Sequence, residues 1–296
     1  MTYLQAIVIG AIQGLTELFP ISSLGHTVLV PSWIGGTWAT LVRQESSSES
    51  PYLAFVVGLH LATAVVLIGF YRRDWVRLIA AFFRTLAKRR VESADERFAW
   101  LIVIATVPVG ILGLVLEHTF RTLFAKPEAA AIFLTVNGLI LFAGERVLRA
   151  RRAAGTTATE EEVADADLDE RLSTIGWRSA LWIGASQALA LLAGISREGV
   201  AMVGGLTRGL TREEALRFAF MLSTPVILAA GVLKLPDLFG SLGDGVRGQV
   251  AAGSVAAVIT SLFAVVFLAR WFRTRTLTPF AWYCLLAGVA SIVRFA

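Results

Sequence analysis

The stretch Gln13–His26, QGLTELFPISSLGH, combines polar and ionisable side chains with helix-breaking residues in a strongly apolar part of the chain. Glu17 and His26 are costly in a membrane segment, so ionisable residues there indicate a functional site. Pro20 interrupts a helix, and non-helical backbone at membrane depth survives only where protein or a polar cavity surrounds it. The stretch therefore predicts a polar pocket built on a broken helix.

The composition is typical of a membrane protein. Hydrophobic residues make up 56% and charged residues 17% of the 296 residues, and the mean hydropathy is +0.68. Soluble domains have about 25% charged residues. The long, continuous apolar runs favour helices over spanning β-strands, which alternate in polarity. A single cysteine, Cys284, excludes an intrachain disulfide and a cysteine-based metal cluster. No basic segment precedes the first apolar run, so we expect it to belong to the mature protein.

The apolar runs predict an all-α polytopic membrane protein with two halves, residues 1–148 and 177–296. Each half begins with a hairpin of two short pieces, at 3–34 and 177–209. Each piece is shorter than the roughly 20 residues of a crossing, so each hairpin is expected to be re-entrant. Three transmembrane helices follow in each half, at about 52–70, 98–116, 130–148, 215–234, 249–269 and 278–295.

Two polar segments are expected to lie outside the spans. Residues 149–176 form a charged cytoplasmic linker, and we expect its acidic run, Glu160 to Asp169, to be a solvated loop. Residues 37–50, TWATLVRQESSSES, are also expected to form a loop.

The second hairpin repeats the first. IGAIQGLTELFPISSLG (Ile9 to Gly25) aligns without a gap with IGASQALALLAGISREG (Ile183 to Gly199). Apolar matches are common in any membrane protein, but matches of Gln, Ser and Gly are not. Since a hairpin plus three spans crosses an odd number of times, the second half is expected to be inverted relative to the first. Paired, interrupted short segments predict a binding site where the halves meet. The identities are Ile9/Ile183, Gly10/Gly184, Ala11/Ala185, Gln13/Gln187, Leu15/Leu189, Leu18/Leu192, Ile21/Ile195, Ser22/Ser196 and Gly25/Gly199.

The basic residues predict the orientation. In this topology 20 of the 27 Lys and Arg residues fall on one side and 6 on the other, and Arg197 lies within the membrane. The richer side is expected to be cytoplasmic. Both termini and the first hairpin then lie on the outside, and the second hairpin enters from the cytoplasm. This distribution, in short loops, accounts for the net charge of +5 without a nucleic-acid partner.

If the hairpin tips meet, they assemble a set of groups suited to phosphoryl chemistry on an anionic lipid headgroup. Gln13 and Glu17 share one helix face, and their oxygens suit a divalent cation. The planar guanidinium of Arg197 suits phosphate oxygens, and free N–H groups at the broken helix ends add anion affinity. The complete set is Gln13, Glu17, Ser22, Ser23, His26, Ser196, Arg197 and Glu198.

Ser22 and Ser23 are candidate nucleophiles, and His26, about one turn away, is the candidate base. Structural roles are the alternatives: an ion pair between Glu17 and Arg197, helix capping by the serines, and hydrogen-bonded packing of His26.

Other polar residues favour structural roles. His60 and Glu145 lie in or at the end of spans, where we expect helix-to-helix hydrogen bonds rather than catalysis. Thr211 and Glu214 form a capping-box pattern at the start of a helix.

QGLTELFPISSLGH resembles the first motif, [EQ]GLTEFLPVSSxGH, of the undecaprenyl-diphosphate phosphatase family, the bacterial bacitracin-resistance membrane phosphatases. The segments 105–113 and 217–231 and the pair Gly144-Glu145 are also similar to family segments. The resemblance implies an inverted-repeat fold in the bacterial cytoplasmic membrane. It also implies hydrolysis of undecaprenyl diphosphate to the monophosphate, which recycles the cell-wall lipid carrier. A homodimer is one assembly that we expect the protein could form.

The resemblance also implies roles for individual residues. Gln13 and Glu17 would be the amide and acidic pair, with Mg²⁺ or Ca²⁺ assisting, and Ser23 and His26 the nucleophile and base. Arg197 would bind the diphosphate. The implied substrate-binding set is Gln13, Ser22, Gly194, Ser196 and Gly199.

The second motif, AGISREGVA (193–201), departs from the family pattern PGxSRSGxT. Glu198 replaces a serine beside Arg197, and its carboxylate would repel a diphosphate unless a metal lies between them or the side chain points away. The position of His60 usually carries Gln, so a second titratable group is added. These departures leave open an alternative function, a transporter or flippase for polyprenyl phosphate without hydrolysis, which inverted repeats also support.

Overall fold

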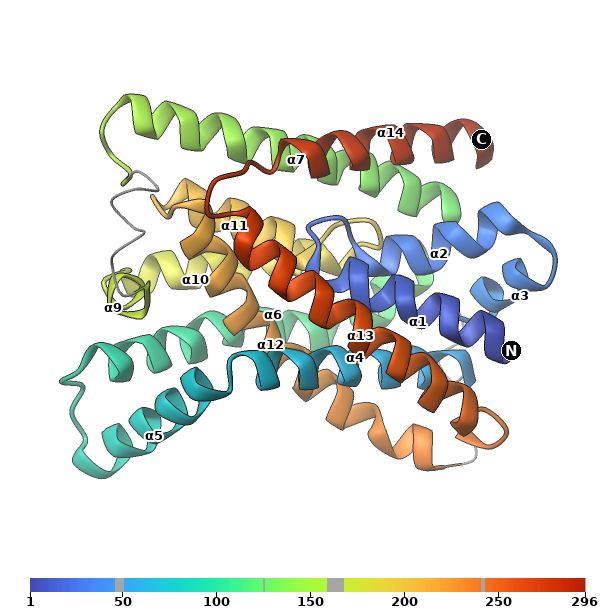
Figure 1. Cartoon of the computed structure of the whole chain (residues 1–296), viewed down its shortest axis with the longest axis horizontal. Helices are drawn as coiled ribbons and strands as arrows, with labels where there is room; N and C mark the ends of the chain where they lie inside the picture. Colours follow the sequence, from blue (N-terminus) through green and yellow to red (C-terminus); the bar gives the residue numbers. More distant parts are fainter. Residues whose placement is uncertain (46–50, 125, 159–167, 241–242, 296) are drawn as a thin grey trace.

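The computed structural model describes residues 1–45, 51–124, 126–158, 168–240 and 243–295. These residues form helices and short connections, with no strand among them (Figure 1). In chain order the elements are α1 (Tyr3–Leu18), α2 (Ser23–Ile34), α3 (Gly36–Glu45), α4 (Pro51–Phe70), α5 (Arg72–Lys88), α6 (Ala94–Phe124), α7 (Pro127–Ala153), α9 (Leu168–Ser173), α10 (Trp177–Ser186), the 3₁₀ helix η1 (Gln187–Leu191), α11 (Arg197–Thr207), α12 (Arg212–Phe239), α13 (Arg247–Trp271) and α14 (Thr278–Phe295).

Within the described residues, five helices are long and apolar enough to cross a membrane. They are α6, α7, α12, α13 and α14. A sixth span is possible where α4 and α5 form one bent pair. The prediction of an all-α, polytopic membrane protein is therefore confirmed at this level.

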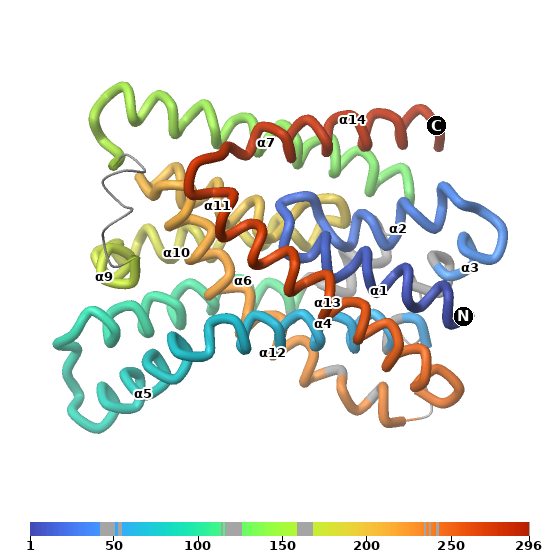
Figure 2. The backbone as a smooth tube through the Cα atoms, in the orientation of Figure 1, coloured from blue at the N-terminus to red at the C-terminus, as the bar shows by residue number. Residues whose placement is uncertain are grey.

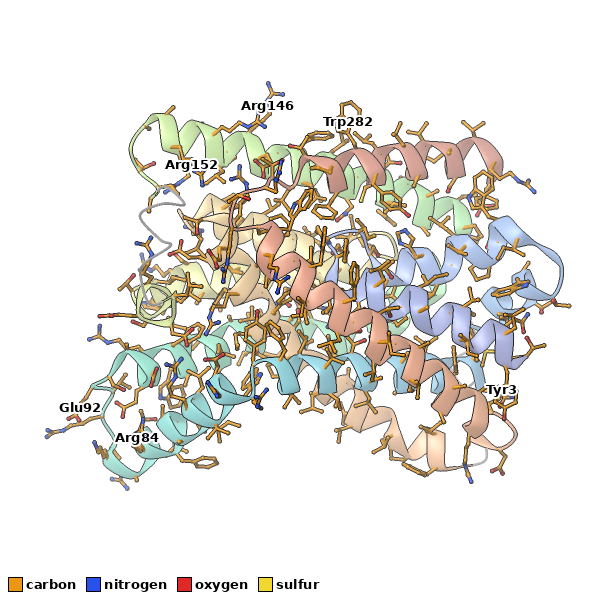
Figure 3. The ribbon with its side chains drawn as sticks, viewed as in Figure 1. Tyr3, Arg84, Glu92, Arg146, Arg152 and Trp282 are labelled. Atoms are coloured by element: carbon orange, nitrogen blue, oxygen red, sulfur yellow. The ribbon has the colours of Figure 1, made fainter. Side chains whose placement is uncertain are left out.

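The long helices run side by side along the molecule (Figures 1 and 2). The two chain termini lie at one end, whereas α9 and the turn between α5 and α6 lie at the other. Arg84, Glu92 and Arg152 project from this second end, away from Tyr3 (Figure 3). Charged connections thus gather at the end opposite to the termini.

Two segments expected to be non-helical are helices. Residues 37–50 were predicted to be a loop, but α3 covers the segment as far as Glu45, and residues 46–50 lie outside the described residues. The chain also bends by 85° after α4 into α5, in the arginine-rich connection between the spans predicted at 52–70 and 98–116. One side of α5 packs on α6, and the other exposes Val76, Ile79, Phe83 and Leu86. The many arginines hid the apolar periodicity of this amphipathic helix.

Close helix packing depends on small residues. A Cβ atom added to Gly10 of α1 would lie 2.2 Å from the carbonyl oxygen of Gly253 in α13. One added to Gly184 of α10 would lie 1.9 Å from the carbonyl oxygen of Ala105 in α6. In lipid, such van der Waals contacts hold helices together because the apolar surroundings remove much of the hydrophobic drive.

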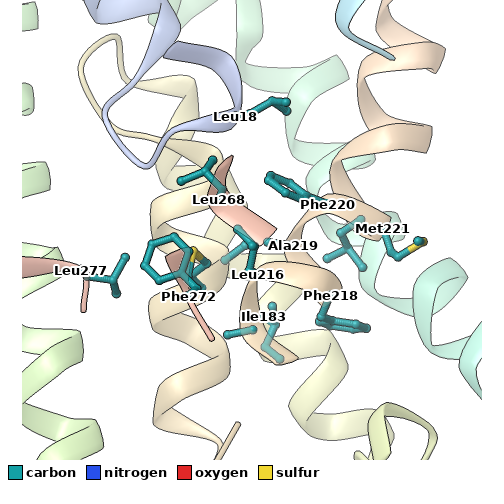
Figure 4. Close-up of a cluster of buried hydrophobic side chains, with 14 of the residues drawn as sticks. Leu18, Ile183, Leu216, Phe218, Ala219, Phe220, Met221, Leu268, Phe272 and Leu277 are labelled. Carbon is teal, nitrogen blue, oxygen red and sulfur yellow. The ribbon is translucent and has the colours of Figure 1, made fainter. Parts of the chain in front are cut away.

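The larger of the buried apolar clusters lies around α12, between α1, α10 and α13 (Figure 4). Phe218 and Phe220 from α12 are fully buried there, together with Leu18, Ile183 and Leu268. This core fixes α12 against the helices that carry both chain breaks.

The acidic run of the linker does not end in solvent. Residues 160–167 of the run lie outside the described residues, but Asp169 in α9 is only 1% exposed. One of its carboxylate oxygens pairs with Arg77 of α5, and the other accepts a hydrogen bond from Arg217 Nε of α12 at 2.7 Å. The expectation of a solvated loop is therefore wrong at Asp169, because two arginines neutralise a carboxylate that would otherwise be costly to bury.

The structural roles predicted at the start of α12 are confirmed. Thr211 and Glu214 form a reciprocal capping box. Glu145 of α7 accepts two hydrogen bonds from Arg212, from Nε and Nη2, each at 2.7 Å, and one from the backbone N–H of Leu277 at 2.8 Å. This bidentate pair joins α7, α12 and the start of α14.

Candidate functional site

The first helix break separates α1 from α2. Helix α1 ends at Leu18 and α2 begins at Ser23. Ser22 is the N-cap of α2, and its Oγ accepts a hydrogen bond from the backbone N–H of Gly25 at 3.2 Å. Its φ is +71°, which is uncommon for a residue with a side chain. Such strained backbone often occurs at functional sites. The capping role considered for Ser22 is therefore confirmed.

The second break, between η1 and α11, has the same cap. Ser196 is the N-cap of α11, and its Oγ accepts a hydrogen bond from the N–H of Gly199 at 3.1 Å. Gly194 has a φ of +111°, and a Cβ there would lie 2.5 Å from the carbonyl oxygen of Ala130. The two caps therefore use the positions that match in the internal repeat.

The two breaks touch each other. The backbone N–H of Gly194 donates to Ser22 Oγ at 3.2 Å, and Ser196 Oγ donates to the carbonyl oxygen of Phe19 at 3.3 Å. A Cβ on Gly25 would lie 3.0 Å from Gly194 Cα. Segments more than 150 residues apart in sequence thus meet, as the prediction of a shared pocket requires.

A residue that was not predicted from the sequence also joins the two breaks. Asn137 of α7 is fully buried. Its Nδ2 donates to the carbonyl oxygen of Pro20 at 2.9 Å, and its Oδ1 accepts from the N–H of Ser196 at 3.0 Å. The sequence does contain a signal for this role: Asn137 is a lone amide in an apolar span, and such residues usually make hydrogen bonds between helices.

Glu17 lies at the centre of the site and is 3% exposed. Its Oε2 accepts hydrogen bonds from Gln13 Nε2 at 3.0 Å and from Ser23 Oγ, and lies 3.4 Å from His60 Nε2. Its Oε1 lies 3.9 Å from Arg197 Nη2. The two breaks therefore place a carboxylate opposite a guanidinium at the point where they meet.

His60 of α4 faces Glu17 of α1, so the helix-to-helix contact predicted for it lies at this site. Its Nδ1 lies 2.9 Å from the carbonyl oxygen of Val56, and its Nε2 faces Glu17. The imidazole therefore lies between the carbonyl oxygen of Val56 on its own helix and the carboxylate of Glu17 on α1.

His26 has different partners from those predicted. Its Nδ1 lies 2.6 Å from the carbonyl oxygen of Ser22, and its Nε2 lies 2.7 Å from the hydroxyl of Tyr283 in α14. The Ser23 hydroxyl instead donates to Glu17. The structure thus brings Ser23 to Glu17 and His26 to Tyr283, a residue with no sequence signal in the family motifs.

Several buried polar atoms at the breaks lack hydrogen-bond partners among the described residues. They are Gln13 Oε1, both amide atoms of Gln187, Arg197 Nη1 and Glu198 Oε1. Buried polar groups are nearly always satisfied, so the unpartnered atoms of Gln13, Arg197 and Glu198 near Glu17 indicate water, an ion or a substrate. This set offers both donors and acceptors to a polar ligand.

The oxygen atoms present fit a hard divalent cation. Glu17, Gln13 and Glu198 supply carboxylate and amide oxygens, the ligands that Mg²⁺ and Ca²⁺ prefer. No group of three or more His, Cys, Asp or Glu side chains suited to a metal occurs among the described residues. A cation would therefore need water or substrate oxygens as well, which is the usual state of protein-bound Mg²⁺.

Comparison with known proteins identifies the family of this chain. A model of the family described as bacitracin resistance protein BacA matches residues 6–290. The chain is 53% identical to undecaprenyl-diphosphatase 2 of Frankia alni, over 100% of this chain and 98% of the relative. It is 55% identical to undecaprenyl-diphosphatase of Mycolicibacterium paratuberculosis, over the same shares. A more distant relative, undecaprenyl-diphosphatase 2 of Chromobacterium violaceum, is 38% identical over 99% of both chains. Because the family model matches both helix breaks and most of the chain, the chain belongs to the bacitracin resistance protein BacA family.

Proposed function

We propose that this protein is an integral-membrane phosphatase that hydrolyses undecaprenyl diphosphate to undecaprenyl monophosphate and inorganic phosphate. The observation that carries the proposal is the Glu17 carboxylate, which binds the Ser23 hydroxyl and faces Arg197 across the two helix breaks. Its full-length relatives are named for this activity. The alternative of a flippase without hydrolysis is not favoured, since the same relatives are named for hydrolysis.

The second break provides the proposed diphosphate site. Arg197 has one contact toward Glu17, while its buried Nη1 lacks a protein partner and can donate to a phosphate oxygen. The guanidinium carries a fixed positive charge in a planar fork that matches phosphate geometry. Ser22, Gly194, Ser196 and Gly199 build the two helix N-termini beside it, where backbone N–H groups favour anions.

Ser23 and Glu17 are the proposed centre of proton transfer. Ser23 Oγ, or a water that it orients, attacks the terminal phosphorus, and Glu17 takes the proton through the existing hydrogen bond. The bond between the terminal phosphorus and the bridging oxygen breaks, and undecaprenyl monophosphate leaves. Attack by water releases inorganic phosphate directly, whereas attack by Ser23 forms a phosphoserine, which a water molecule then hydrolyses to inorganic phosphate and free Ser23. His26, in contact with the Tyr283 hydroxyl, is the proposed second proton carrier. Bound Mg²⁺ or Ca²⁺, with Glu17 and Gln13 as ligands, would neutralise phosphate charge.

The proposed fold is an inverted repeat of 1–148 and 177–296, each a re-entrant hairpin followed by three transmembrane helices, with 149–176 as the linker. Corresponding contacts support it: α1 packs on α13 through Gly10, as α10 packs on α6 through the matching Gly184. Helices α4 and α12, which correspond in this scheme, pack on each other, and so do α7 and α14.

The proposed location is the bacterial cytoplasmic membrane, with both termini outside and the basic connections in the cytoplasm. The amphipathic helix α5 supports this orientation, because its exposed apolar residues and flanking arginines suit an interface with anionic lipid. A homodimer remains a prediction.

Phosphate release from undecaprenyl diphosphate by the purified protein tests the function, with added Mg²⁺, Ca²⁺ or chelator. Wild-type protein is expected to release phosphate, and Glu17→Ala and Arg197→Ala are expected to abolish the release. The control is Arg273→Ala, which removes only an exposed ion pair with Glu213. Phosphate release that survives both site substitutions would refute the proposed mechanism. Movement of the lipid from one membrane leaflet to the other without hydrolysis would favour the flippase alternative instead.

A further inference from the structure

Glu198 is a buried carboxylate that the proposed reaction does not yet use. It lies in the first turn of α11, directly after Arg197, and is 2% exposed. Its Oε1 has no hydrogen-bond partner among the described residues. An ionised carboxylate in such a place is costly unless a positive charge or a set of donors meets it.

The neighbouring protein groups do not supply that charge. The hydroxyl of Ser223 on α12 is a neutral neighbour, and Glu17 adds a second negative charge nearby. Arg197 is the closest fixed positive charge, but its Nη2 already faces Glu17 at 3.9 Å. The imidazole of His60, the other basic side chain described at the site, is directed at Glu17. Arg197 is thus the one permanently charged positive group described beside Glu17 and Glu198, before any substrate charge is added.

A diphosphate increases this imbalance. Its negative charges would have to lie beside Arg197 and hence beside Glu198, without a further positive group from the described residues. A divalent cation resolves the conflict, since it is attracted to the two carboxylates and to phosphate oxygens alike. The amide oxygen Gln13 Oε1, which is also buried and unpartnered, provides another suitable ligand.

We propose that Glu198 is a ligand of the divalent cation, so that this chain holds its metal with two carboxylates, Glu17 and Glu198, one from each helix break. The inference rests on the proposed phosphatase function for the role of the metal, but the binding of the metal is measurable by itself. It also gives a physical reason for the change from serine to Glu198 in the second motif: the carboxylate holds the cation rather than the phosphate directly.

The test is Mn²⁺ binding by the purified full-length protein, followed by electron paramagnetic resonance, with and without methylenediphosphonate. Mn²⁺ replaces Mg²⁺ at oxygen sites and reports binding without turnover. Two variants remove the carboxylate, Glu198→Gln with the same shape and Glu198→Ser with the family residue. The matched control is Glu128→Gln, because Glu128 is also in a helix first turn, that of α7, but is exposed.

Both Glu198 variants are expected to weaken Mn²⁺ binding by about tenfold or more, whereas Glu128→Gln leaves it unchanged. Thermal stabilisation of the protein by Mn²⁺ should decrease in parallel, and thermal unfolding without metal shows whether the variants fold. Unchanged Mn²⁺ affinity in folded Glu198→Gln, with and without the diphosphonate, would overturn the inference and indicate a neutral carboxyl group at this position. Wild-type protein that shows no Mn²⁺ binding in either condition would overturn it too.

Phosphate release separates this inference from the proposed function. A wild-type protein that hydrolyses undecaprenyl diphosphate, while Glu198→Gln binds Mn²⁺ normally, refutes only the ligand role. A protein that binds Mn²⁺ through Glu198 without releasing phosphate refutes only the phosphatase function.

Discussion

The two helix breaks have the same scaffold but different chemistry. In both, a serine caps the following helix through the glycine three residues later, Ser22 with Gly25 and Ser196 with Gly199. Around the first break, the Ser23 hydroxyl donates a hydrogen bond to the Glu17 carboxylate. At the second break, Arg197 Nη1 and Glu198 Oε1 have no hydrogen-bond partner among the described residues. The residues shared by the repeat therefore build the pocket, and the residues that differ between its copies carry the proposed reaction.

The largest effect is expected from the centre of the first break. Glu17→Gln keeps the shape but removes the acceptor for the Ser23 proton, so phosphate release should decrease about 10²–10⁴-fold. Steady-state kinetics with undecaprenyl diphosphate measures this effect. Glu213→Gln, which changes a peripheral carboxylate, should retain the wild-type rate. A Glu17→Gln protein with normal turnover would assign the proton transfer to another group.

The next effect concerns the positive group of the second break. Arg197→Lys retains the charge but loses the planar fork, so kcat/KM should decrease about 10²–10³-fold, similar to the loss of one transition-state donor. Arg273→Lys is the matched change at an exposed arginine and should have little effect. If Arg197→Lys retains kcat/KM as well as Arg273→Lys does, position 197 needs only a positive charge and not the planar guanidinium.

The contact between the two breaks can be weakened without changing Glu17 or Arg197, the proposed catalytic residues. Asn137→Ala leaves the Pro20 carbonyl and the Ser196 N–H without their partner, so unfolding free energy should decrease by about 1–3 kcal/mol. Unfolding in detergent, followed by circular dichroism, measures the change. Thr135→Ala on the same helix is the control, because its hydroxyl bonds only within α7. Equal stability of both variants would show that the breaks do not need the Asn137 bridge.

The smallest effect distinguishes the two caps. Glycine is a better N-cap than alanine at either position, but only Ser22 has a positive φ, which glycine adopts without strain. The stability difference between the Gly and Ala variants should therefore be about 1 kcal/mol larger at Ser22 than at Ser196. Thermal unfolding of the four variants measures it, and equal differences would indicate that Ser22 is not strained.

The sequence alone determined the helical membrane class, the position of both breaks and the chemical types at the site. Apolar runs of span length and interruptions such as Pro20 are local signals, and the motif QGLTELFPISSLGH carries its polar residues within a few turns. The same local signals failed for α5, because its arginines masked an apolar stripe on one helix face.

Only the tertiary structure decided which groups meet. His60 reaches Glu17, Tyr283 reaches His26, and Asn137 joins Pro20 to Ser196, each across a long separation in sequence. Asp169 is buried between two arginines although its neighbours in sequence are acidic. Sequence patterns show where polar groups lie along a helix. Which polar group faces which depends on how the helices pack, and burial then makes each of these pairings necessary.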